Sequence, residues 1–288
     1  WRRSCGGSSS CRLWVPVTEQ ERRLAAYCRR NGYDGALLRR RANVAWLADG
    51  ADVHCDASSP LGVAALLWTP RRKTVLTDTI EAARLRREEF SRAWEFRVSD
   101  WWAAPALPRG RYATDYPVDR IAPLRYSLTP TEVRRLRVLG AECAEALGGT
   151  MRAARRGRSE REAAGDLAGR LRARGILPYV LLVAADGRIA RYRHPIPTAN
   201  RLERTLMVAV CAQRHGLIAC LTRLVHFGRI PPDLRRRHDA VCRVDAALHA
   251  ATVPGARWCD VLREGIRVYR ETGFPGEWKR HHQGGPMG

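Results

Sequence analysis

Three of the eight histidines lie in two segments whose composition suits chemistry. His194 stands in the stretch 191–197, which also holds two arginines and two prolines. Proline restricts the backbone around the imidazole, and arginine can hold a substrate carboxylate. The second segment, residues 281–285, reads His-His-Gln-Gly-Gly, and its glycines allow the backbone to approach a ligand closely. Because imidazole exchanges protons near neutral pH, both segments are candidates for acid–base chemistry.

The remaining histidines give weaker indications, and a purely local role is the alternative for every histidine. His54 falls in an early loop, and His238 and His249 fall in a predicted helix. We expect these three to serve at the surface or in packing.

The nine cysteines are scattered along the chain and form no CxxC pair and no zinc-finger spacing. An odd, unpatterned set in a chain of 288 residues is typical of reduced thiols in a cytoplasm. The sequence therefore predicts a cytoplasmic protein in which most cysteines are small core residues.

The formal charge of +22 raises the possibility of nucleic-acid binding. Nearly all of the positive charge is arginine, since Lys73 and Lys279 are the only lysines. The arginines spread along the whole chain, few aromatic residues interleave with them, and no recognition motif for DNA or RNA is present. Diffuse, solvated charge is the preferred interpretation, and an arginine-rich nucleic-acid surface is the alternative. No apolar run approaches the roughly 20 residues that span a bilayer, so no membrane partner is expected.

The first part of the chain predicts a small α/β domain. Residues 1–16 are rich in Arg, Gly and Ser, and we expect a flexible lead there. Thr18 and Glu21 form a capping box that begins a helix. Expected strands at 35–38, 63–68, 74–77, 94–98 and 111–114, with a helix at 81–89, complete a domain over residues 17–123. Residues 121–127 are the expected linker.

The second part, residues 124–288, opens with helices and continues with strands. Thr129-Pro130-Thr131-Glu132 and Ser159-Glu160-Arg161-Glu162 are capping-box starts for helices over 133–152 and 163–174. Apolar runs predict strands at 179–185, 206–212 and 217–221. Helical spacing then predicts two more helices, at 232–250 and 258–272.

Five short stretches follow one another in an order typical of a known enzyme family. They are Leu128–Glu132, Arg193-His194-Pro195, the segment 216–228 with Leu221-Thr222-Arg223 inside it, Val253–Ala256, and His282–Gly285. In this order they resemble the catalytic domain of the creatinase and X-prolyl aminopeptidase ("pita-bread") hydrolases, which include methionine aminopeptidase, prolidase and aminopeptidase P. Three earlier stretches, Asp34–Leu38, Asn43–Leu47 and Ile80–Ala82, resemble the N-terminal domain of creatinase-type members. The resemblance implies an α/β N-terminal domain and an α+β pita-bread domain that is incomplete at its C-terminus, as in a C-terminally truncated aminopeptidase P-like peptidase.

The resemblance also implies roles for individual residues. His194 matches the family histidine that binds substrate and shuttles protons, and His282 matches a histidine that is a metal ligand in metal-dependent members. These two are the expected catalytic residues. Arg191, Arg193, Arg223 and His281 are the expected substrate-binding residues. The family also implies a homodimer and a small peptide or amino-acid-derived substrate.

Departures from the family pattern affect the metal site most. Ala209 and Cys220 stand where metal-dependent members carry two aspartates, and the family's glutamate ligands would lie beyond Gly288. A divalent ion such as Mn, Co or Zn is implied by the resemblance, but we expect its ligand set not to be preserved. The expected function is an aminopeptidase P- or prolidase-like hydrolase acting on X-Pro peptides or a related small C–N substrate. The alternatives are a metal-free, creatinase-like amidinohydrolase, an inactive binding relative, and an arginine-driven nucleic-acid binder.

Overall fold

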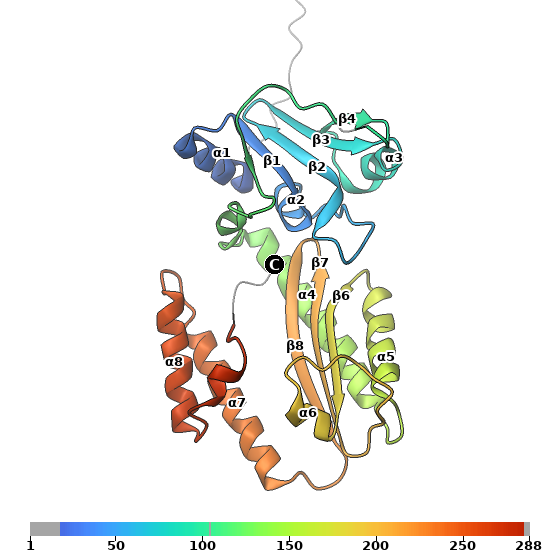
Figure 1. The fold of residues 1–288 in the computed structure, drawn as a ribbon, viewed down its shortest axis with the longest axis vertical. Helices are drawn as coiled ribbons and strands as arrows, with labels where there is room; N and C mark the ends of the chain where they lie inside the picture. The colour runs from blue at the N-terminus through green and yellow to red at the C-terminus, as the bar shows by residue number, and fades with distance from the viewer. Residues whose placement is uncertain (1–17, 104, 285–288) are drawn as a thin grey trace, which may run out of the picture. The chain divides into compact units, whose positions relative to one another are not determined.

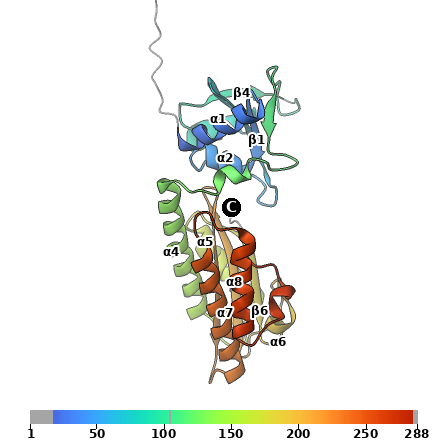
Figure 2. The ribbon, with the colours of Figure 1, turned by 90° about the vertical axis from the view of Figure 1, so that its left-hand side faces the viewer.

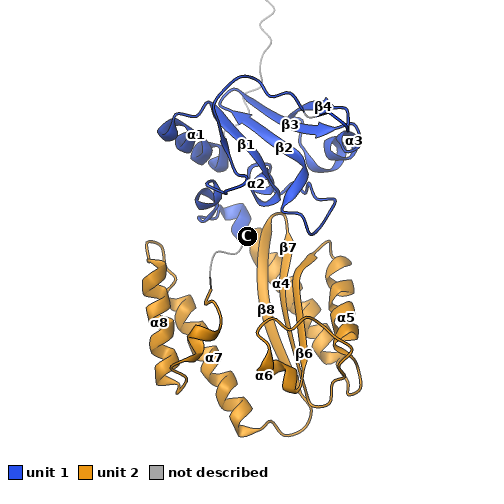
Figure 3. Cartoon of the chain, viewed as in Figure 1, with its two compact units in different colours: residues 1–133 blue, residues 134–288 orange. Residues whose placement is uncertain are grey.

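The computed structural model describes residues 18–103 and 105–284, so the expected lead at 1–16 lies outside the described residues. The chain divides into two compact units, residues 1–133 and 134–288 (Figure 3). Within the described ranges no helix is both long enough and apolar enough to cross a membrane.

The first unit is built on a five-stranded sheet with the strand order β4-β3-β2-β1-β5. Its strands are β1 (Gly35–Arg40), β2 (Leu61–Thr69), β3 (Arg72–Asp78), β4 (Glu95–Ser99) and β5 (Tyr112–Thr114). Its helical segments are α1 (Glu19–Asn31), α2 (Arg41–Leu47), α3 (Ala82–Arg84), the π-helical turn η1 (Leu85–Glu89) and the 3-10 turn η2 (Ala122–Arg125). The mixed α/β architecture expected for this unit is confirmed.

The start of α1 shows the predicted capping chemistry in full. The Thr18 hydroxyl accepts a hydrogen bond from the Glu21 amide at 3.2 Å, and the Glu21 carboxylate accepts from the Thr18 amide at 3.0 Å. These bonds satisfy amides that have no partner inside the helix.

Residues 121–127, the expected linker, lie within the first unit. The segment forms η2, and the Ile121 side chain is fully buried in the core of the first unit. One carboxylate oxygen of Asp119 accepts hydrogen bonds from the amides of Ile121 and Ala122, both at 3.0 Å. The buried Ile121 side chain and the hydrogen bonds to Asp119 help to hold this segment on the domain.

The second unit has a three-stranded antiparallel sheet with the order β6-β7-β8 (Figure 1). Its strands are β6 (Leu177–Ala185), β7 (Thr205–Arg214) and β8 (Leu217–His226). Its helices are α4 (Pro130–Arg152, which begins just before the unit boundary), α5 (Glu160–Arg172), α6 (Gly187–Arg191), α7 (Pro232–Ala251), α8 (Trp258–Glu271) and the 3-10 turn η3 (Glu277–Arg280). The sequence did not predict α6 or η3, which are only five and four residues long.

The two faces of this sheet differ in what covers them. One face packs on α4 and α5, and side chains from all three strands enter that core, including Val183, Val208 and Ala219. Side chains alternate between the faces of a strand. Residues such as Ala209, Cys211 and Cys220 therefore lie on the other face, where they are partly or fully exposed.

Helices α7 and α8 lie side by side, as both ribbon views show (Figure 2). Gly265 of α8 permits their close approach, because a Cβ at this position would lie only 2.7 Å from the Leu248 side chain of α7. The packed pair leads into η3 and the histidine segment that follows it.

Candidate functional site

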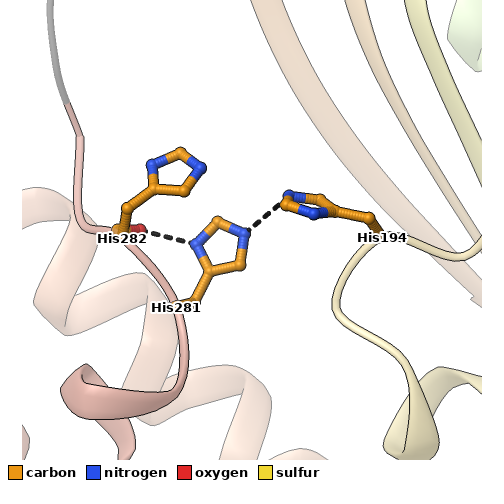
Figure 4. A group of neighbouring side chains, drawn as sticks. All are labelled: His194, His281 and His282. Atoms are coloured by element: carbon orange, nitrogen blue, oxygen red, sulfur yellow. Dashed lines mark hydrogen bonds between the residues drawn. The ribbon is translucent and has the colours of Figure 1, made fainter.

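Three histidines from two distant segments of the second unit form a cluster, which we call the histidine cluster (Figure 4). The Nε2 atoms of His194 and His281 are 3.0 Å apart, within hydrogen-bonding distance. The ring of His282 stacks on that of His281 with centroids 4.2 Å apart, and it lies 6.0 Å from the ring of His194. His194 and His282 are exposed, and His281 is partly buried.

Hydrogen bonds around His281 define which ring nitrogen carries its proton. Its Nδ1 atom lies 2.5 Å from the carbonyl oxygen of His282, and a carbonyl only accepts hydrogen bonds. Nδ1 must therefore donate, which leaves Nε2 of a neutral His281 as an acceptor. The 3.0 Å contact is then a hydrogen bond from Nε2–H of His194 to Nε2 of His281. This hydrogen bond orients the ring of His194.

The segment that carries His194 is held by Glu160, the first residue of α5. This carboxylate is fully buried and accepts hydrogen bonds from the amides of Ala185 and Thr198 at 2.8 and 2.9 Å, and it is paired with Arg188 of α6. Burial alone would raise the pKa of Glu160, but these donors outweigh it and lower the pKa below its ordinary value. A charged Glu160 thus fixes both ends of the loop that presents His194.

Asp186, at the end of β6, holds the other side of the same loop. Its carboxylate accepts hydrogen bonds from the backbone amides of Glu203, Arg204 and Thr205, each at 2.8 Å. Burial acts to raise the pKa of Asp186, and the three amides lower it overall. Asp186 itself has a positive φ of 52°, a conformation that few residue types adopt and that this network stabilises.

The segment that carries His281 and His282 is held by weaker contacts. Glu277 of η3 forms an ion pair with Arg193 at 3.0 Å, in which Arg193 is exposed and Glu277 is partly exposed. The Tyr269 hydroxyl donates to the Gln283 side-chain oxygen at 3.1 Å, and the Gln283 amide donates to the His281 carbonyl at 2.8 Å. Sequence reasoning missed Glu277 and Tyr269, because neither belongs to a motif and only the fold brings them to the cluster.

The arginines predicted to bind substrate fall into two groups. Arg193 lies beside the histidine cluster through its pair with Glu277, and the exposed Arg191 ends α6 in the same segment. Arg223 lies elsewhere. It is directly opposite Val208 across β7 and β8, so it shares the face that packs on the helices, and it donates to the Thr222 carbonyl at 2.8 Å. Its proposed contact with substrate stays a prediction.

The positions that resemblance equates with metal-binding aspartates do not suit a pair of hard divalent ions. Ala209 offers no donor atom. Burial of the sulfur by neighbouring atoms raises the pKa of the Cys220 thiol to about 12, and a hydrogen bond to Cys211 contributes to the rise, although the residue as a whole is exposed. A metal-binding cysteine must lose its proton, and its single soft sulfur does not replace the two oxygens with which a carboxylate bridges two hard ions.

The histidine cluster has a different capacity for metal. One ligand nitrogen from each of the three imidazoles lies within 4.8 Å of the others. Nitrogen donors suit one borderline transition ion such as Zn²⁺ better than hard ions that prefer oxygen. No carboxylate belongs to this group among the described residues, so it fits a single ion and not a bridged pair.

The fold agrees with that of known peptidases. The model of Metallopeptidase family M24 matches residues 134–288, more than half of the chain. No curated protein sequence matches the chain. Because the family model matches more than half of the chain, the chain belongs to metallopeptidase family M24, and the expected resemblance to the pita-bread hydrolases is confirmed.

Solved structures with the same fold include a dipeptidase from Pyrococcus horikoshii OT3, with a TM-score of 0.74 and 17% identity over 94% of this chain and 82% of that one. The prolidase from Pyrococcus furiosus matches with a TM-score of 0.71 and 16% identity over 92% and 83% of the two chains. The Xaa-Pro dipeptidase from Bacillus anthracis matches with a TM-score of 0.69 and 15% identity over 90% and 79%. These likenesses establish the fold.

Proposed function

We propose that the protein hydrolyses X-Pro dipeptides or a related small C–N substrate at the histidine cluster, without a bridged pair of metal ions. The observation that carries the proposal is the 3.0 Å contact between His194 and His281 in a domain of the M24 family. The names of the solved structures, which include prolidases and an Xaa-Pro dipeptidase, favour the X-Pro substrate class.

In this proposal His194 is the group that exchanges a proton with the substrate. Its exposed imidazole can take a proton from a water molecule that attacks the scissile carbon and return it to the leaving nitrogen, so that a C–O bond forms as the C–N bond breaks. His281 accepts the hydrogen bond from His194 and so orients its ring. His282 lines the other side of the cluster by stacking on His281.

Arginine side chains beside the cluster supply the charge that a small acidic substrate needs. Arg193 and Arg191 flank Tyr192 in the segment that ends at His194. Glu277 pairs with Arg193, and a substrate carboxylate would compete with Glu277 for that guanidinium. This arrangement favours substrates with a free carboxylate, such as dipeptides or creatine-like molecules.

The test is hydrolysis of X-Pro dipeptides and of creatine by the purified protein, with and without added Mn²⁺ or Co²⁺. We expect activity in the presence of a chelator, and a loss of about 100-fold or more in kcat/KM for His194→Gln, as general acid–base catalysis predicts. His249→Gln is the matched control, because His249 is an exposed histidine of α7 whose side chain pairs with Asp245.

Each outcome separates the alternatives. Activity that requires Mn²⁺ or Co²⁺ would overturn metal-free hydrolysis. Equal activity of His194→Gln and the native protein would remove His194 from its role. Saturable substrate binding without turnover would favour the second candidate, a binding relative, which the absence of a carboxylate at Ala209 and Cys220 supports.

We also propose that the protein is cytoplasmic, as its scattered cysteines indicate, and that it is a homodimer, as the family resemblance implies. Sedimentation analysis tests the dimer. Nucleic-acid binding stays the least supported alternative. Many described arginines pair with a carboxylate three or four residues away in the same helix, as Arg236 and Arg237 do with Asp233. Retardation of DNA or RNA that falls steeply with salt would revive it.

A further inference from the structure

Two cysteines lie directly opposite each other on the hairpin of β7 and β8. Cys211 and Cys220 are register partners, and their sulfur atoms are 3.3 Å apart, with the Cys220 thiol donating a hydrogen bond to the Cys211 sulfur. The turn of this hairpin is only two residues, His215 and Gly216, with φ values of 54° and 74°. A tight turn of this kind fixes the register, so the two sulfurs cannot drift apart by strand slippage.

The pair is also open to reagents. Cys220 is exposed and Cys211 is partly exposed, on the sheet face opposite the helix-packed core. Cys143 of α4, in contrast, is fully buried in that core. A soluble oxidant can therefore reach the pair without unfolding the unit.

We propose that Cys211 and Cys220 form a reversible cross-strand disulfide by exchange with a low-molecular-weight disulfide such as oxidised glutathione. Directly opposed residues of antiparallel strands have Cα atoms about 4.5–5.5 Å apart. That spacing falls within the roughly 4.4–6.8 Å range of disulfides. The sulfurs must close from 3.3 Å to about 2.05 Å, which side-chain rotation supplies while the strands stay paired.

The exchange takes two steps. Cys211, which receives the hydrogen bond from Cys220, attacks one sulfur of oxidised glutathione as a thiolate, and one glutathione leaves as a thiolate with the bonding electrons. Cys220 then loses its proton to solvent and attacks the Cys211 sulfur of the mixed disulfide, which releases the second glutathione. In total the two cysteines lose two electrons and two protons, and one oxidised glutathione becomes two glutathione thiols.

The order of the two steps follows from the hydrogen bond. Burial of the sulfur, and to a smaller extent the hydrogen bond to Cys211, raises the pKa of Cys220 to about 12. Because Cys220 donates its proton in this hydrogen bond and Cys211 accepts it, Cys211 is the first nucleophile. The mixed disulfide removes this bond and leaves Cys220 next to its target.

The test treats the native protein with oxidised glutathione at neutral pH, blocks remaining thiols with an alkylating agent, and maps tryptic peptides by mass spectrometry. The sequence favours this assay. Trypsin cleaves after Arg204, Arg214 and Arg223, so Cys211 and Cys220 fall in the separate peptides 205–214 and 215–223. We expect these two peptides to be joined, and dithiothreitol to separate them.

Single variants identify the steps. Cys220→Ser should retain one glutathione on Cys211, because the resolving thiol is gone. Cys211→Ser should react many-fold more slowly at Cys220. Cys242→Ser is the matched control, since Cys242 is an exposed cysteine of α7 with no cysteine partner at hydrogen-bonding distance among the described residues. It should cross-link peptides 205–214 and 215–223 at the native rate.

Two results would overturn the proposal. One is a stable glutathione adduct on Cys211 or Cys220 of the native protein without the joined peptides. The other is free alkylation of both cysteines after treatment. Neither result depends on whether the protein hydrolyses X-Pro substrates, since the readout is the peptide mass.

Discussion

The two segments that meet in the histidine cluster are held in opposite ways. The loop with His194 is anchored by Glu160 and Asp186, whose charged carboxylates accept several hydrogen bonds from backbone amides. The segment with His281 and His282 is anchored by an exposed ion pair at Glu277 and by neutral side-chain hydrogen bonds. Buried, charge-assisted bonds contribute more to stability than exposed pairs, which are screened by water.

This difference assigns different tasks to the segments. A rigid loop keeps the imidazole of His194 in place whether or not substrate is present. A weakly held segment can adjust when a carboxylate displaces Glu277 from Arg193. Four measurements test this difference between the two segments, and the change at Glu160 should affect stability most and the change at Glu277 least.

Removal of the charge of Glu160 should have the largest effect. Glu160→Gln leaves Arg188 without its buried partner and replaces an acceptor by a donor next to the Thr198 amide. We expect the free energy of unfolding of the second unit to fall by about 3 kcal/mol, as for other broken buried pairs. Chemical denaturation measures this. A loss below about 1 kcal/mol would mean that the loop is not held by this carboxylate.

Acid should have the second-largest effect, because it should lower the stability of the loop that carries His194. The pKa values of Glu160 and Asp186 are lowered in the folded protein from ordinary values of 4.5 and 3.8. The stability from these carboxylates is therefore complete above the unfolded-state pKa values and is lost as the pH falls through the folded ones. Denaturation between pH 6 and about pH 3 should show this loss. In Asp186→Asn the fall should be shallower, and an unchanged slope would contradict the assignment.

Zn²⁺ should bind to the histidine cluster and stabilise the second unit. A tetrahedral ion with Zn–N distances of about 2.0 Å separates its ligands by about 3.3 Å, close to the 3.0 Å between His194 and His281. A Zn²⁺ concentration 100 times its Kd should stabilise the unit by about 2.7 kcal/mol in thermal unfolding. It should also inhibit hydrolysis, because it occupies the nitrogens of His194 and His281. His281→Ala should lose the thermal effect and His249→Gln should keep it; equal stabilisation of both variants would place the ion elsewhere.

Loss of the exposed ion pair should have the smallest effect on stability. Glu277→Gln should change the free energy of unfolding by no more than about 1 kcal/mol, because both partners are solvated. It should lower the KM for substrates with a free carboxylate, since Arg193 no longer has a competitor. A matched change at Glu264, which pairs with Arg267 on the same face of α8, should leave KM unchanged. A raised KM in Glu277→Gln would show that Glu277 helps substrate binding.

The elements that sequence reasoning found share one property, which is a strong local signal. Thr18 and Ser159 begin helices through capping boxes that the structure shows in full, and the apolar runs of β6 to β8 became strands of one sheet. The short α6 and η3 lack such signals, because a helix of one turn depends on its neighbours more than on its own residues.

Local sequence signals predicted only some of the residues of the candidate site. His194, His281 and His282 were found because proline, arginine and glycine surround them in the sequence. Glu160 was recognised as part of a helix start, but its hydrogen bonds to residues 185 and 198 depend on the folded chain. Likewise, no local pattern indicates that Glu277 meets Arg193, which lies 84 residues away.

The two-residue turn at His215 and Gly216 has a consequence for the order of folding. Pairing of β7 with β8 starts from partners three residues apart, Arg214 and Leu217, and ends at Thr205 and His226. Short loops cost little chain entropy to close, and hairpins form within about 1–10 μs. We expect this hairpin to form first and to serve as the template on which β6 docks. Folding kinetics of Val208→Ala and Val183→Ala would test this, with the larger slowing at Val208.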